Sequence, residues 1–565
     1  MRPAVRGSMS LRFARRAAAA WLLLAITACG AAAGDFRTPG ISIVRVEWRT
    51  VLDQLKSEIE DRPALAGRFT FNALRHLPWS DPRTMPALMQ LNAVTLPLFT
   101  RINQSPVPVL LPFDAGMYLA ERMTSASPRP PLAHFQDGFQ ERMFDAGPAG
   151  YDAKFALPPG AADGMPQLTY KKPVEIQITG SILTYDIDDP SGGKGESVSA
   201  LAAQFPDLRR IIREGYVRYA FTRFGVPYVV SIHCLDSAPR ANRLACREAS
   251  AVAERFLKAL HIAGGRPSQS RMAIAPGVMP RPAASSSDFT YRPPGEIIAN
   301  SGYRGDSGRA DTTVYSQIRF PIERAPAYAN SQSFLNWGDC FHRGRVPPPS
   351  DKGDRYHCKS SNKPLVFDES AAENYSYPWQ DNFCEARDFN VGQCPAGSGH
   401  QGQDLRPATC TLRNKGADRC IPNRHVVVAV RNGVIIRSLR QQGVTLLVNT
   451  RDEHVRFRYM HMNPARLDKD GILDDRRVSE GEKIGLVSNY MDHLGGTTTH
   501  LHFDVQVFTR DGWIWVNPYV TLISAYERLI GGRGREITTE AEAGPQPAKP
   551  QDPVHPEKPA EGEGD

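Results

Sequence analysis

The chain has 565 residues, and 41% of them are apolar. This length exceeds what one hydrophobic core organises and predicts at least two folded units. Its 68 basic and 60 acidic residues give a net charge of +8, but they are spread along the whole chain. This distribution does not favour a nucleic-acid partner, which requires a concentrated basic surface. It is compatible with a partner that is a weakly anionic polymer.

Residues 1–29 are typical of an export signal. Three arginines among residues 12–16 precede the apolar run 17–26, which is too short to span a bilayer as a stable helix. The next residues, Thr27-Ala28-Cys29, complete a pattern that resembles a bacterial lipobox, in which the cysteine is lipidated. We therefore expect a protein of the periplasm or cell envelope that is held at the membrane by a lipid on Cys29. A plain cleavage site nearby is the alternative.

Eight further cysteines follow, an even number that indicates disulfides in an exported chain. None shows the Cys-x-x-Cys spacing of a structural zinc ribbon. Their order along the chain favours four local pairs. The expected pairs are Cys234 with Cys246, Cys340 with Cys358, Cys384 with Cys394, and Cys410 with Cys420.

Residues 30–40 are small and polar and are expected to form a tether, and residues 41–274 are expected to form an N-terminal α+β domain. Apolar residues at helical spacing predict its helices, and β-branched residues in alternation predict its strands. Its role is not indicated by the sequence, and a protein partner for it stays open. The predicted helices span residues 46–60 and 246–260, and the predicted strands span residues 107–111, 174–185 and 227–232.

Composition changes again after residue 274. Residues 275–311 are expected to be a linker because their first part is rich in Pro and Ser. Residues 312–530 are expected to form a mainly antiparallel β-sheet domain, and the Pro- and Glu-rich residues 531–565 a disordered tail. The fold class is therefore multidomain. Strands are predicted over residues 314–322, 425–430, 433–439, 444–448, 455–460, 483–487, 501–508 and 513–516.

Three short motifs in the β domain hold residue types that bind metals. His400 and Asp404 are four residues apart, an even spacing that puts both on one face of an extended segment. His500 and His502 are two apart and share a face for the same reason. His461 follows a predicted strand and could project at the same place. Two imidazoles and one carboxylate, with a fourth position open to water, are typical of a catalytic zinc site.

The order of these motifs resembles the lysostaphin-type (LytM) zinc peptidases. The resemblance rests on His-x-Gly-x-Asp, a later Tyr-x-His, the strand at 481–485, His-Leu-His-Phe-Asp and the closing Val-Asn-Pro-Tyr at 516–519. It covers roughly residues 315–530, and its specificity comes from the agreement of separate motifs in order.

The resemblance implies that His400, Asp404 and His502 bind one Zn²⁺, and that His461 and His500 act beside it on water and the developing oxyanion. It further implies a metalloendopeptidase that hydrolyses cross-link or stem peptides of bacterial peptidoglycan. Two departures from the family pattern leave substrate preference open: the additional loop 410–420, and the loop 489–499, which is longer than the usual Gly-Thr-Gly type.

Two rival interpretations remain. Some family members have lost metal ligands and act as catalytically silent regulators that bind cell wall or activate wall amidases. The intact histidines of this chain favour the enzyme. In the other interpretation the N-terminal domain binds the wall or a partner protein while the peptidase domain is self-inhibited.

Overall fold

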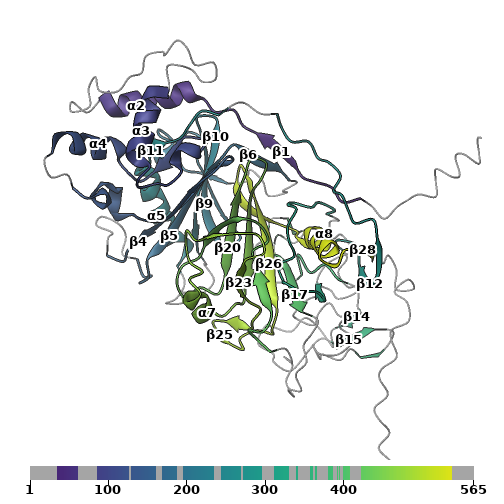
Figure 1. Ribbon diagram of the computed structural model, residues 1–565. Helices are drawn as coiled ribbons and strands as arrows, with labels where there is room; N and C mark the ends of the chain where they lie inside the picture. The colour runs from purple at the N-terminus through teal and green to yellow at the C-terminus, as the bar shows by residue number, and fades with distance from the viewer. Residues whose placement is uncertain are drawn as a thin grey trace, which may run out of the picture.

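The computed structural model describes residues 35–60, 85–125, 129–160, 168–187, 195–234, 244–268, 272–295, 311–329, 339–341, 357–360, 363–364, 379–385, 391, 393–394, 397, 399–407 and 421–536. These residues form mostly antiparallel β-sheet with a few helices (Figure 1). No helix among them is long and apolar enough to cross a membrane. The expected export signal, the lipidation site Cys29 and the Cys410–Cys420 pair lie outside the described residues.

A seven-stranded antiparallel sheet, called here the N-terminal sheet, organises the first half of the described chain. Helix α5 (Cys246–Lys258) covers one face of it, where the Tyr219 hydroxyl donates to Glu254 at 2.8 Å. In order across the sheet, its strands are β3 (Gln140–Ala146), β4 (Gly150–Leu157), β5 (Val174–Ser181), β10 (Val226–His233), β9 (Tyr216–Arg223), β8 (Arg209–Arg213) and β7 (Glu196–Ser197).

Smaller elements pack around this sheet. The predicted strand 174–185 is two strands, because after Ile182 the chain leaves the sheet and pairs as β6 (Leu183–Asp186) with β1 (Gly40–Ile43). Strand β2 (Val109–Leu111) pairs with β11 (His261–Gly264). The helices are α2 (Trp48–Glu60), α3 (Met85–Thr95), α4 (Ala115–Thr124) and α5 (Cys246–Lys258), with short 3₁₀ turns η2 (Ile102–Gln104), η3 (Pro131–His134), η4 (Gln136–Gly138) and η5 (Ser199–Leu201).

An eight-stranded antiparallel sheet, called here the C-terminal sheet, is centred on β26. Leu501, Phe503, Val505 and Val507 of β26 are fully buried on one face, as strict alternation predicts. The strands in order are β13 (Ala327–Ala329), β17 (Gln403–Pro407), β26 (Leu501–Thr509), β21 (His454–Met460), β20 (Val444–Asn449), β19 (Gly433–Ile436) and β22 (Arg477–Val478), and β27 (Gly512–Val516) pairs with β26.

The remaining elements surround the C-terminal sheet. They are the pairs β18 (Val426–Val428) with β23 (Lys483–Leu486) and β24 (Tyr490–Met491) with β25 (His493–Leu494), the ribbon β14 (Asp339–Phe341), β15 (His357–Ser360) and β16 (Lys363–Pro364), and the helices α7 (Pro464–Lys469) and α8 (Tyr519–Ile530).

The structure corrects the expected linker and the start of the expected tail. Residues 285–291 form β12 (Ser285–Tyr291), which pairs in parallel with β28 (Arg533–Glu536). The linker was predicted from the Pro- and Ser-rich composition of the segment. That composition gave no weight to Phe289 and Tyr291, which are buried. Strand β28 has no large apolar residue, and Gly534 lies so close to Phe289 that an added Cβ would stand 2.4 Å from its ring. Residues 314–322, expected as a strand, form no regular strand and have only a bridge from Ile322 to Val427.

The two sheets pack against each other, with helices α2 to α5 on the side of the N-terminal sheet away from the C-terminal sheet (Figure 1). The apolar part of the interface is formed by Met143, Ile211, Ala220, Val229, Val434, Ile436, Leu447, Phe508 and Trp513.

Beside these apolar residues, Asp152 of β4 makes a buried ionic contact with β21. Its carboxylate accepts hydrogen bonds from His454 and Arg456, each at 2.7 Å. Burial would raise the pKa of Asp152, but the charges of His454 and Arg456 outweigh it and lower the pKa to about 2. This carboxylate therefore links the two sheets.

Replacing Asp152 by alanine should lower the free energy of unfolding by about 3 to 5 kcal/mol, because it leaves Arg456 buried without its carboxylate. The contribution of Asp152 is present above its ordinary pKa of 3.8 and is lost as pH falls through about 2. Urea denaturation at neutral pH measures the change. Glu196→Ala is the matched control, because that carboxylate pairs with Arg210 but is 72% exposed. Equal losses for the two variants would contradict the assignment.

Candidate metal centre

Pairing between β17 and β26 places the central residues of the site. Asp404 and His502 are direct cross-strand neighbours. The adjacent Leu501 and Phe503 are buried in the core, so His502 and Asp504 project from the opposite face of β26. Alternation along the strand can be predicted from the sequence. The register of β17 with β26 cannot, because the two strands are almost a hundred residues apart.

His400 reaches the same place through a loop that is held by the segment 379–385. The backbone of His400 exchanges hydrogen bonds with that segment, from Cys384 N–H at 2.9 Å and to Glu385 C=O at 2.7 Å. Its side-chain Nδ1 donates to the carbonyl of Asn382 at 3.0 Å. Gly402 is required between the two ligand candidates, since a Cβ there would stand 2.3 Å from the carbonyl oxygen of Phe503.

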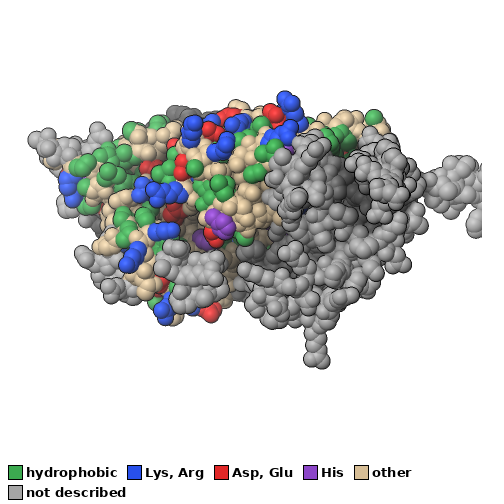
Figure 2. All heavy atoms as spheres, turned by 90° about the horizontal axis from the view of Figure 1, so that it is seen from below, with side chains coloured by type: hydrophobic (Ala, Val, Ile, Leu, Met, Phe, Trp, Pro, Cys, Tyr) green, Lys and Arg blue, Asp and Glu red, His purple; other side chains and the backbone are tan. Residues whose placement is uncertain are grey.

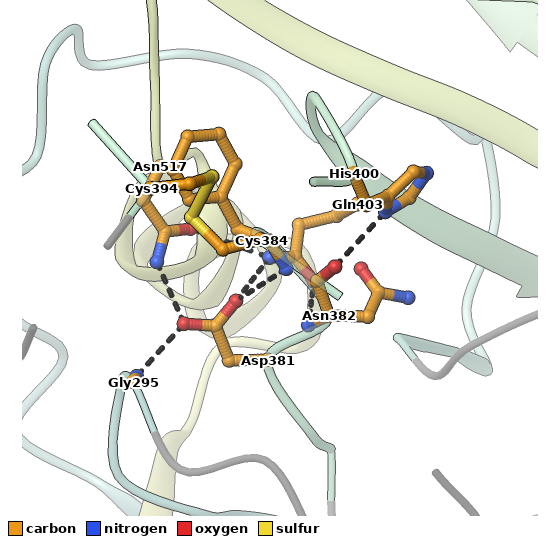
Figure 3. The surroundings of a disulfide bond; sticks show 9 residues. Gly295, Asp381, Asn382, Cys384, Cys394, His400, Gln403 and Asn517 are labelled. Carbon is orange, nitrogen blue, oxygen red and sulfur yellow. Dashed lines mark hydrogen bonds between the residues drawn. A yellow bond between two sulfur atoms is a disulfide. The ribbon is translucent and has the colours of Figure 1, made fainter. Parts of the chain in front are cut away.

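Figure 3 shows how the segment 379–385 is itself fixed. The buried carboxylate of Asp381 accepts hydrogen bonds from the side chains of Gln403 and Asn517 and from the backbone of Gly295 and Phe383. The neighbouring disulfide Cys384–Cys394 closes the loop that follows. The histidine is therefore positioned by a segment that is itself held by the four hydrogen bonds to Asp381.

Two of the expected disulfides are formed, Cys384–Cys394 and Cys234–Cys246. The second connects the end of β10 to the start of α5. Cys340 and Cys358 are in register opposite each other on β14 and β15.

Three hydrogen-bond acceptors converge at the centre. His400 Nε2 and His502 Nδ1 are 2.9 Å apart, and each is 3.3 Å from Asp404 Oδ1. The other nitrogen of each imidazole faces an acceptor, the Asn382 carbonyl for His400 and the Asp504 carboxylate at 3.2 Å for His502. In the neutral rings the two lone pairs therefore point at each other and at the carboxylate.

Such a cluster favours a positive charge at its middle. The donor atoms of His400, Asp404 and His502 all lie within 4.8 Å of one another, and all three residues are buried. Two imidazole nitrogens and one carboxylate oxygen are a donor set that fits zinc. Figure 2 shows histidine side chains beside an acidic side chain at the surface of one face of the molecule, whereas His400, Asp404 and His502 themselves are buried.

The pKa shifts agree with that charge distribution. Burial alone would raise the pKa of Asp404, but the imidazoles of His400 and His500 hold it well below its usual range. Burial would lower the pKa of His502, but its hydrogen bonds to Asp404 and Asp504 raise it. The carboxylate is therefore ionised, and the position between it and His502 attracts a cation.

Asp504 fixes the orientation of His502. One of its oxygens faces His502 Nε2 and also accepts from Arg458 Nε at 2.7 Å, while the other accepts from Trp515 Nε1 at 3.1 Å. Arg458 is held in turn by Gln401 at 2.6 Å. Strand alternation indicates the position of Asp504, whereas Arg458 and Trp515 follow from strand register and carry no local sequence signal.

His461 and His500 lie beside the three acceptors. The ring centroid of His461 is 4.6 Å from that of His500 and 6.1 Å from that of His502. His461 directly follows β21 and has a positive φ of 66°, a conformation that is uncommon for a residue other than glycine. Continued alternation would turn its side chain toward the face opposite Met460, and the left-handed backbone turns it toward the other histidines.

Both of these histidines present Nε2 to the site. Their Nδ1 atoms donate to backbone carbonyls, that of Tyr490 at 3.0 Å for His461 and that of Thr498 at 2.7 Å for His500. Burial and the neighbouring His502 lower the pKa of His461 to about 4, and burial holds the pKa of His500 well below its usual range. Each ring is therefore neutral at pH 7 and can accept a proton at Nε2, which in His500 lies 3.5 Å from Asp404 Oδ1.

No protein-family model matches the chain. No curated protein matches it either. Solved structures similar to part of it include a protein from Ruminococcus gnavus ATCC 29149 assigned as a glycyl-glycine endopeptidase LytM, with 19% identity, coverage of 26% of this chain and 53% of that chain, and a TM-score of 0.18. Another is Csd3 of Helicobacter pylori, with 20% identity, coverage of 17% and 23%, and a TM-score of 0.12. The chain thus spans about half of the first protein, and TM-scores this low carry no argument about function.

Replacing Asp504 by alanine should weaken zinc binding by about 10- to 100-fold, because His502 loses the acceptor that fixes its ring with Nδ1 toward Asp404. Isothermal titration with ZnCl₂ measures the affinity. Asp511→Ala is the control, since that carboxylate pairs with Arg209 at 2.6 Å at the far end of β26. An Asp504→Ala variant with the parent's affinity would show that His502 is oriented by other contacts.

Proposed function

We propose that this chain is an exported zinc metalloendopeptidase that hydrolyses peptide bonds in bacterial peptidoglycan. The observation that supports the proposal most directly is the convergence of His400, Asp404 and His502, with two further neutral histidines beside them. A structural zinc site uses all four positions for protein ligands, whereas three protein ligands leave one position open for water. The arrangement therefore suits catalysis better than structural support.

The histidines supply proton transfer and oxyanion stabilisation. When bound, zinc would lower the pKa of a coordinated water to about 7 and polarise the scissile carbonyl. His461 Nε2 and His500 Nε2 can accept the proton of that water, pass it to the leaving amine, and donate a hydrogen bond to the developing oxyanion. Their backbone acceptors, Tyr490 and Thr498, keep each Nδ1 occupied, so Nε2 is the atom that acts.

The substrate class and the compartment belong to the proposal as well. Peptidoglycan stem or cross-link peptides follow from the LytM-type order of the motifs around the five site residues. Residues 1–29 have the character of an export signal, and lipidation at Cys29 would hold the enzyme at the membrane that faces its substrate.

His502→Ala should abolish zinc binding, whereas His461→Ala should keep zinc and lose turnover by about 10²- to 10⁴-fold. The difference arises because His502 contributes one of the three converging atoms, and His461 lies outside them. Metal content by atomic absorption and the rate of peptide release, measured on the same preparations, separate the two roles. Turnover at the parent rate in His461→Ala would contradict its catalytic assignment.

Digestion of purified peptidoglycan by residues 30–565, followed by mass spectrometry of the fragments, tests the proposal as a whole. We expect peptide fragments that disappear with Asp404→Ala and remain with His425→Ala, a histidine of the same domain that is outside the site. The new termini identify the bond that is cut. Bound zinc without cleavage would contradict the proposed enzymatic activity and favour a regulator that binds cell wall or activates wall amidases.

A further inference from the structure

The hairpin β8–β9 of the N-terminal sheet reaches the part of the C-terminal sheet that supports the metal centre. It turns at Glu214 and Gly215, whose φ values are 59° and 74°. Tyr216, the first residue of β9, lies with its ring centroid 6.3 Å from that of Trp515 on β27. The hairpin therefore contacts a residue that lies one hydrogen bond away from Asp504.

The position of Tyr216 is fixed from its own side. Arg218 places its guanidinium carbon 5.3 Å from the centroid of the Tyr216 ring. Arg218 is in turn held by Glu214 at 2.9 Å, and both of these charged side chains are buried. A buried ion pair with this geometry restricts the conformation of the turn.

Trp515 connects this turn to the metal centre. Its side chain is 1% exposed, and it packs in one cluster with the disulfide loop, against which Tyr216 lies. Its Nε1 donates to Asp504, and the guanidinium carbon of Arg458 lies 5.1 Å from its ring centroid. Besides His502, two side chains donate to Asp504. One is Trp515 itself, and the other is Arg458, which lies over the Trp515 ring.

Groups of the β8–β9 turn also act electrostatically on Arg458. Burial would lower the pKa of Arg458, but Asp504, Tyr216 and Glu214 outweigh it and raise the pKa. Arg458 donates to the same Asp504 oxygen that faces His502 Nε2, so the turn and the candidate ligand are connected through one carboxylate.

We propose that the β8–β9 turn is a positioning element of the metal centre, in which Tyr216 packs against Trp515 and so holds Asp504 and His502 in their ligating orientation. This inference rests on the proposed zinc site. It makes the N-terminal sheet part of the peptidase unit, in contrast to a separate module for wall or partner binding. The affinity for metal then depends on how the two sheets are docked.

The test is the zinc dissociation constant of the full exported chain, measured by competition with a chromogenic chelator. Tyr216→Leu removes the ring and should weaken zinc binding about 10-fold. Tyr216→Phe keeps the ring and should restore most of the affinity. The absorption spectrum of the Co²⁺-loaded protein gives a second readout, because a reoriented His502 changes the ligand geometry, and a merely destabilised fold leaves it unaltered.

Tyr219→Leu is the matched control. Tyr219 is on the same strand and fully buried, but it faces helix α5 on the other side of the sheet. This variant should lower the melting temperature and leave zinc affinity and the Co²⁺ spectrum unchanged. Parent-like affinity in Tyr216→Leu, or an equal loss in Tyr219→Leu, would overturn the positioning role.

The outcomes also separate this inference from the proposed function. In one outcome, the parent protein binds zinc but cuts no peptidoglycan, while Tyr216→Leu weakens its zinc binding. That result would contradict the proposed reaction and support the positioning role. A parent protein that binds no zinc would remove both.

Discussion

The metal centre depends on the pairing of β17 with β26. This register places Asp404 directly opposite His502 and brings its carboxylate next to the imidazoles of His400 and His502. A shift of one residue would turn Asp404 toward the core and replace it at the site with Gln403 or Leu405. The close approach of Gly402 to the Phe503 backbone tolerates no side chain there, so glycine at this position permits the register.

The same pairing creates an electrostatic cost, and much of the surrounding structure offsets it. Three acceptors that face one another repel when no cation lies between them, and their burial reduces the hydration that would offset this repulsion. The loop that bears His400 is therefore fixed by backbone hydrogen bonds to residues 384–385 and by the Cys384–Cys394 disulfide. Asp504, with two side-chain donors, fixes His502. Rigidity of this kind preserves the ligating orientation, because relaxation would move the lone pairs apart.

Local patterns predicted five strands of the C-terminal sheet, which are β19, β20, β21, β26 and β27. Strands β13, β17 and β22 of the same sheet were not predicted as strands. Strand β26 was predicted over residues 501–508 and is observed over Leu501–Thr509. The predictions of a linker and a disordered tail were wrong at β12 and β28. There, two segments of polar composition form a strand pair through their backbones. The site residues Arg458 and Trp515 were missed, since only register brings them to Asp504. The contact of Asp152 with His454 and Arg456 was missed for the same reason, as it joins two sheets.

The face of β26 that bears the candidate ligand His502 also carries the interface with the N-terminal sheet. His502 and Asp504 lie toward one end of this face, and Phe508, packed in the interface, lies at the other. The six residue steps from His502 to Phe508 span about 20 Å of strand. Gln506 lies between them and pairs in register with Arg456 and Trp515, which contact the N-terminal half of the chain. The candidate ligand His502 and the contacts with the N-terminal sheet therefore lie along one strand, joined by the pairing of Gln506 with Arg456 and Trp515.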